Sequence, residues 1–207
     1  MNLPSLKDCE KLLDEFCVPG HVKDHSRKVA EIAVFIAKKL NEQGVRVNTE
    51  LVKAAALLHD IAKPMEFSEK TKASEECLKI WKNLKNNYSG HTEAGYYVLK
   101  NDYPEIADII RRHAYKAVVS ADLYPADWEA KLVTYADKRV AHDQIVSLAQ
   151  RFEEGHKRWR QNLPHTYESK AEIERIDKEY FKIEKEIFAK AKISPDSIND
   201  KNVKGLL

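Results

Sequence analysis

Four histidines and two aspartates stand in or beside apolar segments of this 207-residue chain. They are His25, His59, Asp60, His91, His113 and Asp137. An ionised carboxylate in such a segment is costly unless a partner or a cation compensates it. One inward histidine or aspartate is usually hydrogen-bonded within a core, but six would each need a separate partner. A divalent metal ion satisfies them together, because imidazole nitrogen and carboxylate oxygen both bind first-row transition metals.

The spacing of nearby apolar residues places these side chains on inward faces. His25 shares a helix face with Val29 and Ile32, and Asp137 follows Val133 by one turn. The other histidines have similar apolar neighbours. Six ligands exceed the needs of one open tetrahedral site and suit two metal ions bridged by Asp60.

Three segments resemble the signature of the HD-domain superfamily of metal-dependent phosphohydrolases. They are HSRKVAEIA (25–33), ALLHDIAK (56–63) and YADKRV (135–140). The resemblance covers roughly residues 20–150 and implies a helical bundle. It also implies metal ligation by His25, His59, Asp60 and Asp137.

A further pair of segments, HTEAGYYVL (91–99) and IIRRHAY (109–115), resembles the extra histidines of dinuclear members. His91 and His113 would then complete a two-metal set. The layout is similar to that of the bacterial HD hydrolases that split diadenosine tetraphosphate symmetrically. The cyclic-di-GMP phosphodiesterase branch carries a GYP signature that AGYYVL does not supply, so membership of that branch is not expected.

The resemblance implies cleavage of a phosphate ester or anhydride, with a nucleotide as the expected small phosphorylated substrate. Two metal ions about 3.5–4 Å apart can activate a bridging water, and we expect the resulting hydroxide to attack phosphorus. Asp60 and Asp137 are expected to be catalytic, since either could take the proton. Lys63 is expected to be catalytic and to bind substrate phosphate, although it would also complement the end of a helix before Pro64. Arg139 is the other expected substrate-binding residue.

The expected cofactors are two divalent transition-metal ions, Fe or Mn, with Co, Ni and Zn as alternatives, because His/Asp sites accept several metals. Two other functions stay open, a di-iron HD-type oxygenase and a metal-stabilised ligand sensor without catalysis. Dinucleotide-binding, P-loop, zincin and serine-hydrolase motifs are absent from the sequence. His21, His142, His156 and His165 are interpreted as structural or solvated.

Composition predicts an all-α protein. Six glycines and seven prolines are too few for the turns of a β-sandwich or barrel. The 35 basic residues nearly balance the 33 acidic ones, so we expect no duplex nucleic acid partner. The N-terminus has no signal pattern and no segment is apolar over a membrane-spanning length, so we expect no membrane and a cytoplasmic location. Cys9, Cys17 and Cys77 are expected to be reduced thiols.

Periodicity and capping residues predict helices over 5–17, 22–41, 50–63, 91–101, 104–115, 126–154 and 168–192. A helix-containing insertion is expected between 68 and 90, a connection over 155–168 and a loose polar tail after 192. No segment alternates as a strand would. We expect an HD domain over 1–155 and a C-terminal helical extension over 156–207 that packs on it.

The last expected helix carries an apolar stripe that includes Ile173, Ile176 and Tyr180 at alternating spacings of three and four. The stripe would dock on the chain's own bundle or pair with a second copy. The chain is therefore expected to be a monomer or a homodimer.

Overall fold

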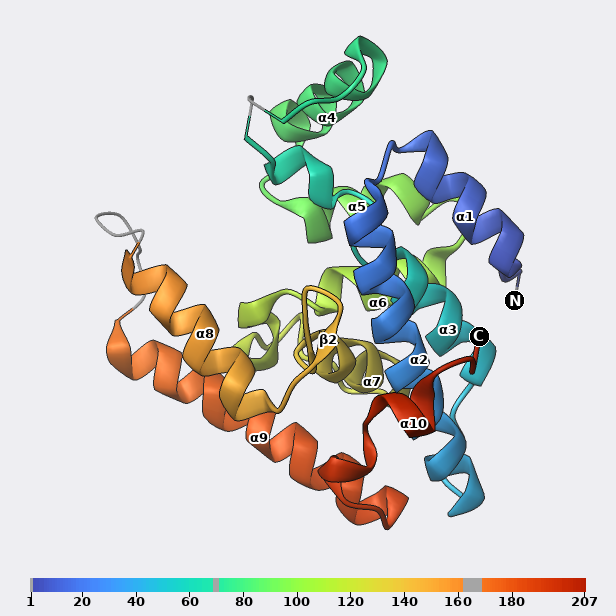
Figure 1. The fold of residues 1–207 in the computed structure, drawn as a ribbon, viewed down its shortest axis with the longest axis vertical. Helices are drawn as coiled ribbons and strands as arrows, with labels where there is room; N and C mark the ends of the chain where they lie inside the picture. The colour runs from blue at the N-terminus through green and yellow to red at the C-terminus, as the bar shows by residue number, and fades with distance from the viewer. Residues whose placement is uncertain (1, 69–70, 162–168) are drawn as a thin grey trace.

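The computed structural model describes residues 2–68, 71–161 and 169–207. In these residues the fold is all-α, as expected, apart from one short hairpin (Figure 1). The α-helices are α1 (Leu6–Glu15), α2 (Gly20–Glu42), α3 (Thr49–Leu58), α4 (Glu75–Asn87), α5 (His91–Leu99), α6 (Pro104–Arg112), α7 (Trp128–Asp137), α8 (Leu148–Gln161), α9 (Lys170–Ala191) and α10 (Asp200–Val203). The 3₁₀ helices are η1 (Lys63–Glu66), η2 (Tyr115–Val119) and η3 (Pro195–Ser197), and the strands are β1 (Val140–Ala141) and β2 (Gln144–Ile145). None of the described helices has the length and apolar composition needed to cross a bilayer.

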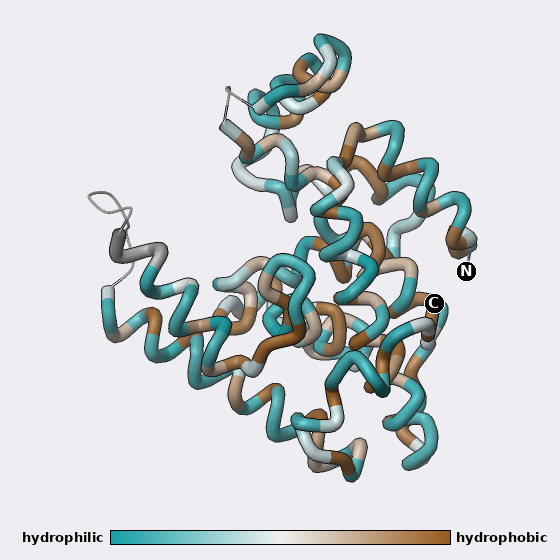
Figure 2. The backbone as a smooth tube through the Cα atoms, viewed as in Figure 1, coloured by the Kyte–Doolittle hydropathy of each residue, from teal (hydrophilic) through white to brown (hydrophobic). Residues whose placement is uncertain are grey.

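Helix α2 is the centre of the core. It packs against α3, α7 and α9, while α3 also packs against α6 and α7. Residues Val29, Ile32 and Ile36 of α2 are completely buried. Figure 2 shows hydrophobic and hydrophilic positions alternating along the helices, as expected when one face of each is buried.

Helix α3 ends earlier than expected. The predicted helix over 50–63 included His59 and Asp60, but α3 stops at Leu58. Beyond it the backbone N–H of Ile61 donates to Leu58 O and that of Lys63 to Asp60 O, which are tighter i→i−3 bonds. Pro64 limits how far the helix could continue, because it lacks the N–H that would donate to Asp60 O.

The predicted helix over 126–154 is two helices separated by a hairpin, so the expectation of no strand was wrong here. Strands β1 and β2 pair antiparallel with Val140 opposite Ile145. His142 begins the turn between them with a φ of 59°, in the left-handed region. The hairpin is closed by tertiary contacts that periodicity does not reveal, since the buried Arg139 donates from Nε to Val146 O. Helix α8 then runs to Gln161, through part of the expected connection.

Helix α9 buries most of the predicted stripe within the same chain. Ile176, Tyr180 and Ile183 are fully buried, and α9 contacts α2, α7 and η2. Figure 1 shows α8 and α9 running side by side. The division of the chain at residue 155 and its oligomeric state stay predictions.

The polar tail is ordered rather than loose. Ile198 is 3% exposed and Val203 is fully buried. The backbone N–H of Gly205 donates to Glu31 on α2 at 2.8 Å. Two apolar side chains in an otherwise polar segment are enough to hold it against the bundle.

The expectation of three reduced cysteines was wrong for two of them. Cys17 and Cys77 form a disulfide that joins the end of α1 to α4. The indole N–H of Trp81 donates to Phe16 O beside it. Spacing alone could not show this pairing, because the two cysteines are 60 residues apart and meet only when α4 folds back. Cys9 is a buried free cysteine, and burial raises the pKa of its thiol to about 12.

The disulfide predicts that reduction destabilises the protein. A crosslink between residues 60 positions apart restricts the unfolded chain, so reduction should lower the free energy of unfolding by about 2–4 kcal/mol. Urea unfolding with and without dithiothreitol measures the difference. The double variant Cys17→Ser/Cys77→Ser is the control and should not respond to dithiothreitol. Three titratable thiols in the denatured, unreduced protein would contradict the prediction.

Candidate metal centre

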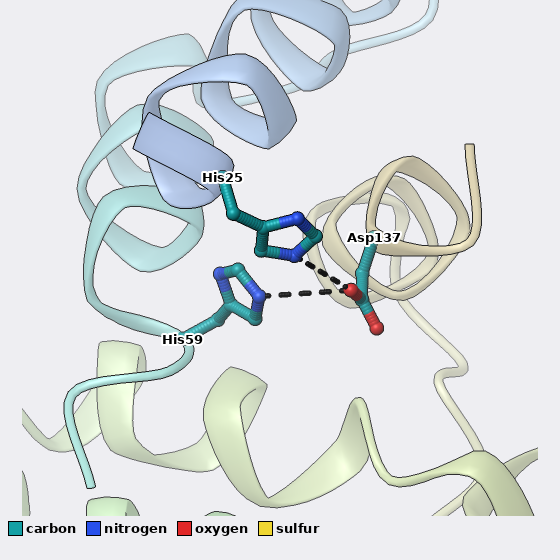
Figure 3. A group of neighbouring side chains, drawn as sticks. All are labelled: His25, His59 and Asp137. Carbon is teal, nitrogen blue, oxygen red and sulfur yellow. Dashed lines mark hydrogen bonds and ion pairs between the residues drawn. The ribbon is translucent and has the colours of Figure 1, made fainter. Parts of the chain in front are cut away.

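The fold brings the six sequence-predicted ligands together from distant segments. His25 lies on α2, His59 and Asp60 follow α3, His91 begins α5, His113 follows α6 and Asp137 ends α7. Figure 3 shows His25, His59 and Asp137 facing one another from three of these segments. Except for His25, which lies in the second turn of α2, each ligand lies at or just beyond a helix end, where the backbone can turn a side chain toward a common point.

The histidine Nε2 atoms face the two carboxylates. His25 Nε2 lies 3.1 Å from Asp137 Oδ1. His91 Nε2 lies 3.3 Å from Asp60 Oδ1 and 3.3 Å from His113 Nε2. His113 Nε2 lies 3.8 Å from the same Asp60 oxygen. Four imidazoles therefore present the same ring nitrogen to one small volume around Asp60 and Asp137.

The backbone of the ligand segments fixes two of the rings. His59 Nδ1–H donates to Ala56 O at 2.7 Å, and His113 Nδ1–H donates to Ile110 O at 2.6 Å. In both cases the acceptor is the carbonyl three residues earlier. Since a carbonyl only accepts, the proton lies on Nδ1 and the lone pair on Nε2, which is the arrangement of metal-binding histidines.

Distant segments fix the other two rings. His25 Nδ1–H donates to the carbonyl of His142 in the hairpin turn, at 2.9 Å. His91 Nδ1 is 2.6 Å from Glu66 Oε1 on η1, and the backbone N–H of His91 reaches the same oxygen at 3.2 Å. Glu66 and the His142 carbonyl thus orient ligands without touching the centre.

His59 gives the clearest sign that the donor set suits a cation. Its side chain is fully buried, and Nε2 has no hydrogen-bond partner. The nearest carboxylate oxygens are Asp60 Oδ2 at 3.5 Å and Asp137 Oδ1 at 3.7 Å. A buried nitrogen without a partner, aimed between two carboxylates, fits a divalent metal ion. Two sets of three close donor atoms are present, His25/His59/Asp137 and His59/Asp60/His113.

The charges agree with this arrangement. Burial alone would raise the pKa of Asp60, but His59, His113 and His91 hold it well below its usual range. Burial would also raise the pKa of Asp137, but Lys138, His25 and His59 hold it well below its usual range. Both carboxylates are therefore anionic at neutral pH.

The histidines respond in opposite directions. Burial lowers the pKa of His113 to about 4, which leaves a neutral imidazole. Burial would also lower the pKa of His59, but Asp60 and Asp137 outweigh it and raise the pKa. The site thus favours positive charge at His59 Nε2, and metal binding there would displace a proton.

The centre opens into a cavity of about 660 Å³. Every predicted ligand except His59 lines it. Three basic side chains reach it, Lys63, Lys138 and Arg151, and so do the acidic Asp24, Asp143 and Glu154. The three basic side chains are the groups that could contact an anionic ligand.

The structure does not bring Arg139 to this cavity. Arg139 is 4% exposed and donates to Val146 O, to Tyr135 OH and to Pro195 O. It binds the hairpin to the C-terminal region instead. The neighbouring Lys138 takes the position that the sequence suggested for Arg139.

The other histidines divide into two groups. His21 and His142 line the cavity, although both were interpreted as structural or solvated. His156 pairs with Asp177, with Nε2 and Oδ2 3.3 Å apart. His165 lies outside the described residues. An ideal helix would turn His142 away from Asp137, and the hairpin removes that geometry.

Sequence reasoning missed Glu66 and Arg151. In the sequence, Glu66 stands out only weakly, as an acidic residue three positions after Lys63. Its contact with His91 spans 25 residues, which local spacing does not reveal. Arg151 lies on α8, whose position beside the cavity follows from the unexpected hairpin. Neither residue belongs to the H…HD…D pattern.

The family model of the HD domain matches residues 22–188. The chain belongs to the HD-domain family. The chain is 31% identical over 134 residues to the dihydroneopterin 2′,3′-cyclic phosphate phosphodiesterase of Methanocaldococcus jannaschii. The alignment covers 64% of this chain and 50% of that protein, so the chain spans about half the length of this relative. No solved structure matches the chain.

Glu66 generates a prediction about metal affinity. Glu66→Ala removes the acceptor that orients His91, so we expect the affinity for Mn²⁺ to fall by about 10–100-fold. Glu66→Gln keeps an acceptor oxygen and should recover part of the loss. Competition against a chromophoric chelator measures the affinity. Glu75→Ala, an exposed position on α4, is the control. Equal affinities for Glu66→Ala and the wild type would exclude the orienting role.

Proposed function

We propose that the protein is a metal-dependent phosphohydrolase that cleaves a phosphate ester in the cavity beside the six-ligand centre. The observation that carries the proposal is the common orientation of four histidines around Asp60 and Asp137, with His59 Nε2 buried and unpaired. Membership of the HD-domain family and the phosphodiesterase relative support the same reaction class.

Two divalent metal ions are proposed, with Fe or Mn as the first choices. His59 has one available nitrogen and serves one ion. That ion would be held by His25, His59 and Asp137, and the second by His91 and His113, with Asp60 between them. Bound ions would supply Lewis acidity, which polarises a phosphoryl oxygen and lowers the pKa of water.

The chain's own side chains position the substrate and handle its charge. Lys63 lies at the cavity with its ammonium 2.8 Å from Glu66, so it can meet a phosphoryl oxygen as a point charge. Burial would lower the pKa of Lys63, but Asp60 and Glu66 raise it and keep the side chain cationic. Asp60 and Asp137 are the proposed proton acceptors.

The proposed substrate is a small phosphodiester, with a 2′,3′-cyclic phosphate as the first candidate. The relative from Methanocaldococcus jannaschii is named for such a substrate. A nucleoside 2′,3′-cyclic phosphate carries the same reactive group and is also consistent with the nucleotide substrate expected from the sequence. Arg139 has no role in this proposal, because its guanidinium is used within the fold.

Asp60 is the sharpest test of the centre. Asp60→Asn keeps the shape but removes the charge between the ions, so we expect hydrolysis to fall by more than about 100-fold. Phosphorus NMR of Mn-loaded protein with adenosine 2′,3′-cyclic phosphate and neopterin 2′,3′-cyclic phosphate follows monoester formation. Elemental analysis of the same samples gives metal per chain. Asp122→Asn, at an exposed position, is the control. A fully active Asp60→Asn protein would exclude the proposed centre.

Lys63 separates substrate binding from metal binding. Lys63→Ala removes a charge-assisted contact to phosphate, so kcat/KM should fall by about 10–100-fold. Metal content should stay equal to that of the wild type. Steady-state kinetics and elemental analysis measure the two quantities. Loss of metal in this variant would mean that Lys63 supports the centre rather than the substrate.

A further inference from the structure

A second cavity, here called the side cavity, adjoins the proposed catalytic cavity. It has a volume of about 270 Å³. Tyr115, Lys138 and Arg151 line both cavities, so the two spaces meet at these side chains. The remaining walls come from α8 and α9, through Phe152, Gly155, His156 and Ile173. None of the predicted metal ligands lines the side cavity.

The walls of the side cavity are flat and held in place. The Tyr115 ring stacks on Tyr180 at 5.9 Å, and the rings of Phe152 and His156 are nearly parallel at 6.2 Å. Asp177 accepts the Tyr115 hydroxyl at 2.8 Å and pairs with His156. Fixed aromatic faces with an aliphatic neighbour suit a planar ring better than a flexible chain.

The junction between the cavities is cationic. Lys138 Nζ donates a hydrogen bond to Asp137 Oδ2, so the junction is connected to the candidate metal centre. In the described part of the chain the Arg151 side chain has no hydrogen-bond or ion-pair partner, and its Nε is buried. A buried guanidinium N–H without an acceptor is costly, and phosphate oxygens match its geometry.

Space is available at Gly155. A Cβ added there would meet no atom within 4 Å. A glycine inside a helix costs about 0.5–1 kcal/mol relative to alanine, so its place on the wall of the side cavity calls for a reason. Room for a bound ring is such a reason.

We propose that the side cavity binds the planar nitrogen heterocycle of the substrate while Arg151 contacts its phosphate at the junction. The inference rests on the proposed function and deepens it, because it makes the substrate a heterocycle-bearing phosphate ester. Purine and pterin rings share the required chemistry, a planar ring with polar edges. A sugar or glycerol phosphate would leave the aromatic walls without a partner.

The first test compares three cyclic phosphates. Adenosine 2′,3′-cyclic phosphate carries a purine, neopterin 2′,3′-cyclic phosphate a pterin, and glycerol 1,2-cyclic phosphate no ring. In the wild type, kcat/KM for one ring-bearing substrate should exceed that for the glycerol compound. The selectivity ratio is kcat/KM for that ring-bearing substrate divided by kcat/KM for the glycerol compound. Gly155→Leu fills the side cavity, so this ratio should fall by about 10–200-fold, the range for a lost apolar contact. Preference for the purine or for the pterin substrate identifies the ring.

Matched variants keep the comparison interpretable. Glu153→Leu places the same side chain at an exposed position on α8 and should leave the ratio unchanged. Ile173→Phe narrows the side cavity from α9 and should lower the ratio as well, which covers the case in which Gly155→Leu does not fold. Circular dichroism melting shows whether each variant is folded. An unchanged ratio in a folded Gly155→Leu or Ile173→Phe protein would overturn the inference.

A binding measurement separates this inference from the proposed function. Saturation-transfer NMR with adenosine and with neopterin, which carry no phosphate, reports contact of ring protons with the protein. Contact is expected in the wild type and in Glu153→Leu, and it should be lost in Gly155→Leu. If none of the three cyclic phosphates is hydrolysed but this pattern holds, the proposed function fails and the ring site stands. Absence of ring contact with both adenosine and neopterin would overturn the ring site.

Discussion

Two buried carboxylates surrounded by four imidazoles are the constraint on which the rest of the structure depends. Asp60 and Asp137 are 9% and 7% exposed, and each must recover the hydration that it loses on burial. The histidines are arranged to do this, with Nε2 turned toward the carboxylates and Nδ1 held elsewhere. An arrangement that concentrates so much polarity inside an apolar bundle is stable only if every ring is held from behind.

The unexpected hairpin is one of these supports. Its turn carbonyl at His142 holds His25, and its base is held by the buried Arg139. Arg139 also contacts Tyr135, whose hydroxyl donates to Glu184 on α9 at 2.7 Å. These hydrogen bonds, together with the backbone of the hairpin, therefore join α9 to a proposed metal ligand on α2. Helix α9 supports the centre through these contacts although it supplies no ligand.

The opposite side of the centre is supported by a separate device. Pro64 and the tight turns before it place η1 so that Glu66 meets His91. Helix α4 packs against η1 and is tied to the end of α1 by the disulfide. Phe67, which follows η1, contacts both His21 at the cavity and Trp81 on α4. The insertion between the ligand segments is thus mechanically connected to the rim of the site.

In the proposed function, chemistry and substrate choice are divided between different parts of the fold. The proposed ligands come from residues 25–137, which carry the family pattern, whereas the side cavity is built largely by α8 and α9. Under this proposal, the same metal chemistry would act on different substrates if α8 and α9 changed. This division is consistent with function that lies in sites grafted on a common fold.

Much of the fold and the six-residue cluster were accessible from residue types and spacing. Apolar periodicity identified most helices, and the burial of His59 and Asp60 in an apolar run pointed to a compensating cation. These signals are local, because helix formation and face burial depend on residues within a few turns of one another. The hairpin, the Cys17–Cys77 disulfide, the Glu66 support and the position of Arg151 were not accessible. Each depends on contacts between segments far apart in the chain, and such contacts exist only once the helices have packed.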